Sequence, residues 1–190
     1  MMDFRSFLAI DLPTAIKDRL AGQIRILSPG TSGIKWVDAR QIHLTLKFFG
    51  SISTEMVDKI NEFTQIVALN IQPFSLTLKG VGGFPHIRRP RIIWAGLSRD
   101  LETLLKLVEK LEIAYGNIGI AREDRSFHPH LTLGRNKTNQ PNAILFQRLS
   151  GWMEEESESF RVEEILLYKS DLKSFGPVYN KICSFPLKGE

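Results

Sequence analysis

The sequence has very little cysteine and no long apolar run. Cys183 is the only cysteine among 190 residues, which excludes an internal disulfide framework and favours a reducing compartment. The longest apolar runs, such as Phe7 to Ile10, have four residues, whereas a membrane-spanning helix needs roughly 20. A transmembrane helix and a secretory signal core are therefore not expected. We expect a cytoplasmic protein that makes no contact with a membrane.

The chain carries similar numbers of positively and negatively charged residues. The chain has 25 Lys and Arg against 21 Asp and Glu, a net charge of +4. This mild excess permits an anionic substrate without requiring one. With 43% hydrophobic and 24% charged residues, the composition is that of an ordinary globular chain, long enough for one domain or two small lobes. We expect it to be a monomer.

One short motif occurs twice. The sequence His-Leu-Thr-Leu occupies residues 43–46 and again residues 130–133, which begin 87 positions later. The alternation of polar and apolar residues predicts a β-strand in both places, because strand side chains point to opposite faces with period two. Each strand then presents an imidazole and a hydroxyl roughly 7 Å apart on one face. Strict alternation also places Lys47 on the face of His43 and Phe48 on the opposite face.

Strand and helix patterns follow one another in two similar series, and each series contains one copy of the motif ahead of a helix. Such a pseudo-repeat predicts an α+β fold of two pseudo-symmetric lobes, with mainly antiparallel sheet, helices outside and a cleft between the lobes. We expect residues 1–190 to form one bilobal domain. The pattern predicts a single strand from Phe160 to Ser170. It predicts a loop from Gly80 to Pro90, which carries Arg88 and Arg89.

Two histidines that face one cleft can act as an acid–base pair, because the imidazole pKa of about 6.5 allows one ring to be neutral and the other protonated. Phosphodiester hydrolysis needs a base for the attacking water and an acid for the departing oxygen. Hydroxyls of Thr45 and Thr132 can bind the non-bridging oxygens, where negative charge gathers. Arg135 is close in sequence but points away on a regular strand. A bulge at Gly134 would redirect it.

Three other kinds of site fit the residues less well. His128 and His130 are two apart and can form a ligand pair on a strand, but no acidic or cysteine ligand is expected nearby on that face of the strand, so we expect no metal. A nucleophilic site is unsupported, since no GxSxG motif is present and Cys183 lies in an alternating strand. A non-catalytic RNA-binding module remains an alternative. It would not need two proton-transfer groups.

In its context, the repeated motif resembles the two-histidine (2H) phosphoesterase superfamily, and within it the RNA 2′,3′-cyclic phosphodiesterases, historically called 2′-5′ RNA ligases. The likeness covers nearly the whole chain, which makes it far more specific than a His-x-Thr pair alone. It rests on the stretches 7–13, 36–37, 43–50, 84–85, 88–91, 94–96, 127, 129–135 and 176–179.

The resemblance implies hydrolysis of a 2′,3′-cyclic phosphate at an RNA end to a 2′-phosphate, without metal or cofactor. It implies that His43 donates the proton to the leaving 3′ oxygen and that His130 accepts the proton of water. Thr45 and Thr132 would bind the phosphate. A reversible 2′-5′ RNA ligase is an alternative, in which a 5′ hydroxyl replaces water as the nucleophile. In the reaction back to the cyclic phosphate the same two histidines exchange roles.

The arginines are assigned from their positions in the sequence. Arg135 is expected to assist phosphate binding because it follows the second motif closely. Arg88 and Arg89 are expected to contact RNA.

Overall fold

The computed structural model describes residues 3–138, 140–152, 156–173 and 176–189. The strands are β1 (Phe4–Ile10), β2 (Ile34–Trp36), β3 (Leu44–Ile52), β4 (Phe74–Phe84), β5 (Ile92–Ser98), β6 (His130–Asn136), β7 (Glu156–Val162), β8 (Glu164–Lys173) and β9 (Gly176–Pro186). The helices are α1 (Thr14–Leu27), α2 (Thr54–Leu69), α3 (Leu101–Gly116) and α4 (Ala143–Ser150), with a short 3₁₀ turn, η1 (Ala39–Gln41).

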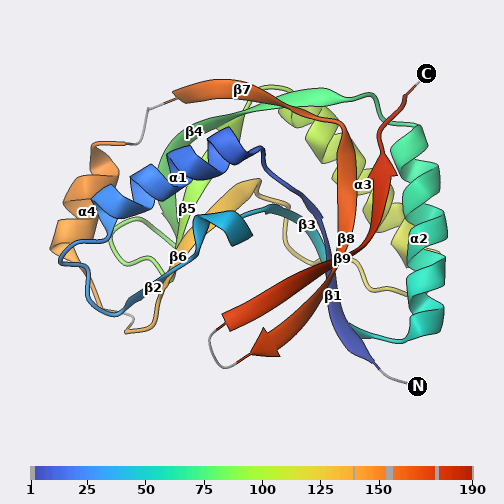
Figure 1. Cartoon of the computed structure of the whole chain (residues 1–190), viewed down its shortest axis with the longest axis horizontal. Coiled ribbons are helices and arrows are strands. Elements are labelled where there is room, and N and C mark those ends of the chain that lie inside the picture. Colours follow the sequence, from blue (N-terminus) through green and yellow to red (C-terminus); the bar gives the residue numbers. More distant parts are fainter. Residues whose placement is uncertain (1–2, 139, 153–155, 174–175, 190) are drawn as a thin grey trace.

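The strands form one antiparallel sheet in the order β7-β4-β5-β6-β3-β1-β8-β9, with β2 also paired to β6. In Figure 1, α1 and α4 lie on the side of β4, β5 and β6, whereas α2 and α3 lie on the side of β8 and β9. The prediction of an α+β fold with antiparallel sheet and flanking helices is confirmed. Within the described ranges, no helix is both long enough and apolar enough to cross a membrane.

Local sequence accounts for the helix pair α2–α3. The Ser53 hydroxyl caps α2 by accepting a hydrogen bond from the Met56 amide at 3.3 Å, which satisfies one of the free amides of the first turn. The buried side chains of α2 recur at helical spacing, so one face of the helix turns inward. On that face Thr64 hydrogen-bonds the Tyr115 hydroxyl of α3 at 2.7 Å. The two helices therefore pack as a unit against their half of the sheet.

The two halves of the sheet meet at the repeated motif. Leu44 of β3 pairs with Leu131 of β6, and both side chains are almost fully buried. The two motif strands run antiparallel through this pair. Extending the register by one residue on either side sets His43 across from Thr132, and Thr45 across from His130. One residue pair thus brings the two copies of the motif together on one face of the sheet.

Each motif strand has a β-bulge at the same place. In β3 the partners of Ala9 and Leu8 are Thr45 and Lys47, so the residue between them is unpaired. In β6 the partners of Trp94 and Ile93 are Thr132 and Gly134, and again the intervening leucine is unpaired. A bulge inserts one extra residue and so reverses the facing of the side chains beyond it. Both strands therefore change face directly after the motif.

The bulge in β3 contradicts the sequence-based placement of Lys47 and Phe48. Phe48 lies on the face of His43, where it is 61% exposed and its ring centroid is 5.9 Å from that of Phe7. Lys47 instead points into the interior and is 4% exposed. Strict period-two alternation failed here because the extra residue shifts the phase of the strand.

Buried Lys47 connects β3 to the segment that leads into the second motif. Its ammonium lies 2.8 Å from Glu112 Oε1 of α3 and donates a hydrogen bond of 2.9 Å to the Ala121 carbonyl. Glu123 Oε1 is 3.9 Å away. These bonds satisfy a cation that would otherwise be costly to bury. They also tie the chain between α3 and β6 to the strand that follows His43.

Two other sequence-based boundaries were wrong. The stretch predicted as a loop from Gly80 begins as strand, because β4 continues to Phe84. A Cβ at Gly82 would collide with the Trp94 ring of β5, so this glycine allows the close approach of a large side chain. The stretch from Phe160 to Ser170 is divided between β7 and β8 at Glu163, whose carbonyl accepts the Leu187 amide at 2.7 Å.

We predict that Lys47→Met lowers the free energy of unfolding by about 3 kcal/mol or more, because it leaves Glu112 partly buried without its cation. Adding Glu112→Leu should restore much of this loss, since the unpaired carboxylate is then gone. Chemical denaturation measures both effects. As a control, Arg161→Ala removes an exposed ion pair with Glu163 (3.6 Å) and should cost no more than about 1 kcal/mol. Equal losses in Lys47→Met and Arg161→Ala would contradict the anchoring role.

Candidate active site

His43 is held by its backbone neighbour and by aromatic rings. Its Nδ1 lies 2.8 Å from the Gln41 carbonyl oxygen. The imidazole stacks on Phe7 with a centroid distance of 4.7 Å and meets Tyr179 edge-on at 5.2 Å. Gln41 is itself fixed, since its side-chain amide donates to the Pro177 carbonyl at 3.0 Å. The ring of His43 is therefore oriented by β1, η1 and β9 together.

His130 is held in the same way from the other half of the sheet. Its Nδ1 lies 2.7 Å from the His128 carbonyl oxygen, which again belongs to the residue two positions earlier. Phe84 meets the imidazole edge-on at 5.1 Å, and Trp94 packs against Phe84 at 5.3 Å. The two histidines thus share a backbone contact that repeats with the motif, while their aromatic neighbours differ.

The shared contact fixes the same tautomer in both rings. A carbonyl oxygen only accepts hydrogen bonds, so Nδ1 of each histidine carries the proton and donates it. Among the described residues, none bonds Nε2 of either ring. Each Nε2 can therefore accept a proton when its ring is neutral and donate one when its ring is charged. These are the two functions that an acid–base pair requires.

The hydroxyls of the motif complete the arrangement. Thr45 and Thr132 are half-buried, and neither hydroxyl bonds to another described residue. In the register of Leu44 and Leu131 each threonine lies across from the histidine of the other motif. Two imidazoles and two hydroxyl donors therefore gather on one face, as the repeated motif predicted.

Arg135 joins this group because of the bulge in β6. The expected redirection is found: the unpaired residue is Leu133, directly before Gly134, and the side chain of Arg135 returns to the face of Thr132. Burial has the largest effect on the pKa of His130 and on that of Tyr179, and the nearby guanidinium charge acts on both in the lowering direction. Arg135 therefore acts electrostatically on both halves of the site.

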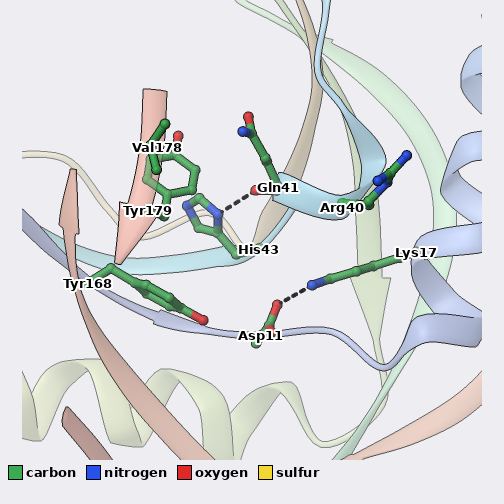
Figure 2. A pocket seen from close by; sticks show the side chains of 8 residues that line it. All are labelled: Asp11, Lys17, Arg40, Gln41, His43, Tyr168, Val178 and Tyr179. Atoms are coloured by element: carbon green, nitrogen blue, oxygen red, sulfur yellow. Dashed lines mark hydrogen bonds and ion pairs between the residues drawn. The ribbon is translucent and has the colours of Figure 1, made fainter. Parts of the chain in front are cut away.

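A pocket of about 280 Å³ opens beside His43, and Figure 2 shows the side chains around it. Tyr168 and Tyr179 approach the imidazole from β8 and β9, and Asp11 forms an ion pair of 2.7 Å with Lys17. His130 is not among the lining residues, so the pocket extends from the His43 side of the site. Its lining consists of Asp11, Lys17, Arg40, Gln41, His43, Tyr168, Val178 and Tyr179.

Burial dominates the ionisation of the groups in the site. It lowers the pKa of His43 and of His130 below the ordinary value of 6.5, against the opposing effect of their carbonyl hydrogen bonds. Burial also raises the pKa of Tyr168 to about 12 and raises the pKa of Tyr179. Both phenols therefore keep their protons at neutral pH and can donate hydrogen bonds to an anion.

The two remaining arginines predicted from the sequence lie between β4 and β5. Arg88 and Arg89 are exposed, and the Arg88 guanidinium lies 5.6 Å from the centre of the Phe146 ring on α4. His86 is also exposed.

The structure adds three aromatic residues that sequence reasoning did not assign to the site: Phe7, Tyr168 and Tyr179. Phe7 and Tyr179 had one sequence signal, because both belong to stretches that resembled the family. Tyr168 had none, since its position beside His43 follows only from the pairing of β8 with β1.

Residues 12–173 match the 2′-5′ RNA ligase superfamily. This match spans well over half of the chain. The chain belongs to that superfamily. The predicted resemblance to the 2H phosphoesterases is thereby confirmed.

Individual members of the superfamily align over nearly the full length. An RNA 2′,3′-cyclic phosphodiesterase of Methanothermobacter thermautotrophicus is 31% identical and covers 98% of this chain and 100% of its own. That of Methanocaldococcus jannaschii is 33% identical, with 94% and 98% covered. Among solved structures, TT0787 of Thermus thermophilus has a TM-score of 0.81 at 29% identity, and E. coli LigT complexed with 3′-AMP has 0.80 at 26%. Both structural alignments cover 98% of this chain and 99% of the other.

We predict a bell-shaped dependence of kcat/KM on pH, with its optimum on the acid side of 6.5. In the free enzyme the base must be neutral and the acid protonated, so the optimum lies midway between the two macroscopic pKa values. Burial lowers both pKa values, and their midpoint falls with them. Initial rates at low substrate concentration between about pH 4 and 9, roughly the range over which imidazoles titrate, measure this. An optimum clearly above 6.5 would contradict it.

Proposed function

We propose that this chain hydrolyses the 2′,3′-cyclic phosphate end of RNA to a 2′-phosphate, by acid–base catalysis between His43 and His130. The Leu44–Leu131 pair is the observation that carries the proposal, because it brings both motifs onto one face with Nε2 of each histidine unbonded by described residues. The names of the curated relatives support the substrate class.

In the proposed reaction, Nε2 of neutral His130 takes a proton from water, whose oxygen attacks phosphorus. The bond between phosphorus and the 3′ oxygen breaks in line with the attack. Nε2 of protonated His43 gives its proton to that departing 3′ oxygen, so the 2′ ester remains. Thr45 and Thr132 donate hydrogen bonds to the non-bridging oxygens, where negative charge increases in the transition state. Arg135 adds a positive charge beside them.

The charges around the two rings support this division of roles. Asp11 stabilises the protonated form of His43, with a larger effect than the opposing charge of Lys17. Arg135 and His128 disfavour the protonated form of His130. The charged neighbours therefore favour His43 as the acid and His130 as the base. A bound phosphate anion further stabilises the imidazolium of the acid, which offsets the loss of its proton through burial.

The same arrangement also allows a reversible ligation. A 5′ hydroxyl in place of water gives a 2′-5′ linkage when His130 deprotonates it, and cleavage of that linkage exchanges the two roles. The name of the superfamily supports this second activity.

Three further expectations belong to the proposal. Arg88 and Arg89 add to RNA affinity through their exposed charge. Residues 1–190 act as one monomeric, bilobal domain in the cytoplasm. The single cysteine, Cys183, is free and supports a reducing compartment.

Replacing either histidine by alanine should lower kcat by at least roughly a hundredfold, because each supplies one proton transfer. The assay is turnover of a short RNA with a 2′,3′-cyclic end, with the product identified as a 2′-phosphate or 3′-phosphate. Circular dichroism serves as the folding control. His86→Ala, which replaces an exposed histidine, should leave kcat unchanged. Near wild-type rates in both His43→Ala and His130→Ala would show that this site is not catalytic.

A substrate whose leaving group needs no protonation separates the two roles. If His43 is the acid, such an activated phosphodiester should partly rescue His43→Ala and leave His130→Ala impaired. The difference arises because only the acid becomes dispensable when the leaving oxygen is already a weak base. Rescue of His130→Ala alone would reverse the assignment.

We predict that activity survives an excess of chelator. Within the described ranges, no three His, Cys, Asp or Glu side chains gather as a metal-binding group, and both histidines use Nδ1 on a carbonyl. The measurement is the rate after prolonged EDTA treatment followed by removal of the chelator. A rate that falls with EDTA and returns with a divalent ion would show that a metal takes part.

A further inference from the structure

Two cations stand side by side on the strands next to the proposed phosphate site. Lys35 of β2 pairs directly with Arg135 of β6, and paired residues of antiparallel strands have side chains on the same face. Both side chains are exposed, and neither bonds to another described residue. Like charges directly across from one another destabilise a sheet. The pair therefore lacks a structural explanation within the described chain.

The bulge in β6 determines the face of the sheet on which the side chains of Lys35 and Arg135 lie. Because Leu133 is the unpaired residue, Arg135 faces the same side of the sheet as His130 and Thr132, and Lys35 shares that face through its pairing. The effect of the Arg135 charge on both His130 and Tyr179 agrees with this placement. Lys35 thus lies one strand beyond Arg135, on β2, whose one partner among the described strands is β6.

We propose that Lys35 and Arg135 form a binding site for a second RNA phosphate, adjacent to the one that reacts. An anion between the two side chains removes their mutual repulsion and accepts charge-assisted hydrogen bonds from both. This inference rests on the proposed function, and it adds a substrate preference. RNA long enough to reach the second phosphate-binding site is bound better than a single cyclic nucleotide. Arg135 serves the reacting phosphate as well, whereas Lys35 serves only the second one.

The second phosphate has two possible sources with the same chemistry. One is the phosphodiester on the 5′ side of the terminal nucleotide, which a cyclic mononucleotide does not have. The other is the first phosphodiester of the strand that supplies a 5′ hydroxyl in ligation, or leaves with it in cleavage of a 2′-5′ linkage. Because His130 is proposed to activate the nucleophile, that strand also passes on the side of β6.

Four substrates distinguish these sources in the Lys35→Ala variant. The first two are uridine 2′,3′-cyclic phosphate and a uridine trinucleotide with a cyclic end. The others are a 2′-5′-linked dinucleoside monophosphate and its homologue with one more phosphodiester on the leaving strand. We expect Lys35→Ala to lower kcat/KM by roughly tenfold or more, the loss of one hydrogen bond to a charged group, only for a substrate that carries the second phosphate.

A loss of kcat/KM confined to the cyclic trinucleotide assigns the second phosphate-binding site to the substrate strand. A loss confined to the longer 2′-5′-linked substrate assigns it to the strand with the 5′ hydroxyl. Equal losses on all four substrates, or no loss on any, would overturn the proposal. Failure of the wild-type enzyme to turn over any cyclic phosphate would instead refute the proposed function, so the two failures are distinguishable.

Control variants distinguish loss of the phosphate contact from a general loss of activity or stability. Lys35→Arg should retain the discrimination between long and short substrates, because it keeps the charge. Lys106→Ala removes an exposed lysine from α3 and should affect none of the substrates. Lys35→Ala should melt at the wild-type temperature or above, since it relieves a like-charge pair. With the trinucleotide or the longer linked substrate, whichever responds, it should also weaken the dependence of KM on salt.

Discussion

The site depends on the contact between Leu44 and Leu131. These two buried side chains join the halves of the sheet where the copies of the motif meet. The hydrophobic effect favours this contact on the interior face, and the polar residues on either side of each leucine must then lie together on the opposite face. The geometry of the imidazoles and hydroxyls is thus a consequence of burying two leucines. A slip of one residue by either strand would turn the histidine and the threonine of that strand to the opposite face, away from those of the other motif.

The bulges after the motif give two similar strands different functions. In β3 the reversal of facing sends Lys47 inward, where it holds Glu112 and the segment before β6. In β6 the corresponding inward position is Gly134, and the next residue, Arg135, returns to the site. The same backbone irregularity therefore buries a cation in one half and leaves a cation exposed on the face of the histidines in the other. The two halves are alike in backbone and unlike in charge.

This asymmetry extends to the surroundings of the histidines. His43 lies against Phe7 and Tyr179 beside a pocket that contains Asp11. His130 has Phe84 at its edge and Arg135 as a nearby positive charge. Two identical side chains can differ in proton affinity only through their environments. Here the shared carbonyl contact supplies the same tautomer, and the unlike charges supply the difference.

The sequence by itself determined the type of fold and the candidate residues of the site. Period-two alternation in a repeated four-residue motif is a local property, so the sequence alone predicted that His43, Thr45, His130 and Thr132 belong to the candidate site. Residues such as Tyr168 were not, because their relation to His43 depends on strands that meet only in the folded sheet. The facing of Lys47 and the strand partner of Lys35 were likewise decided by tertiary structure. Bulges and pairing register are set by how the whole sheet packs, and a single chain segment does not encode them locally.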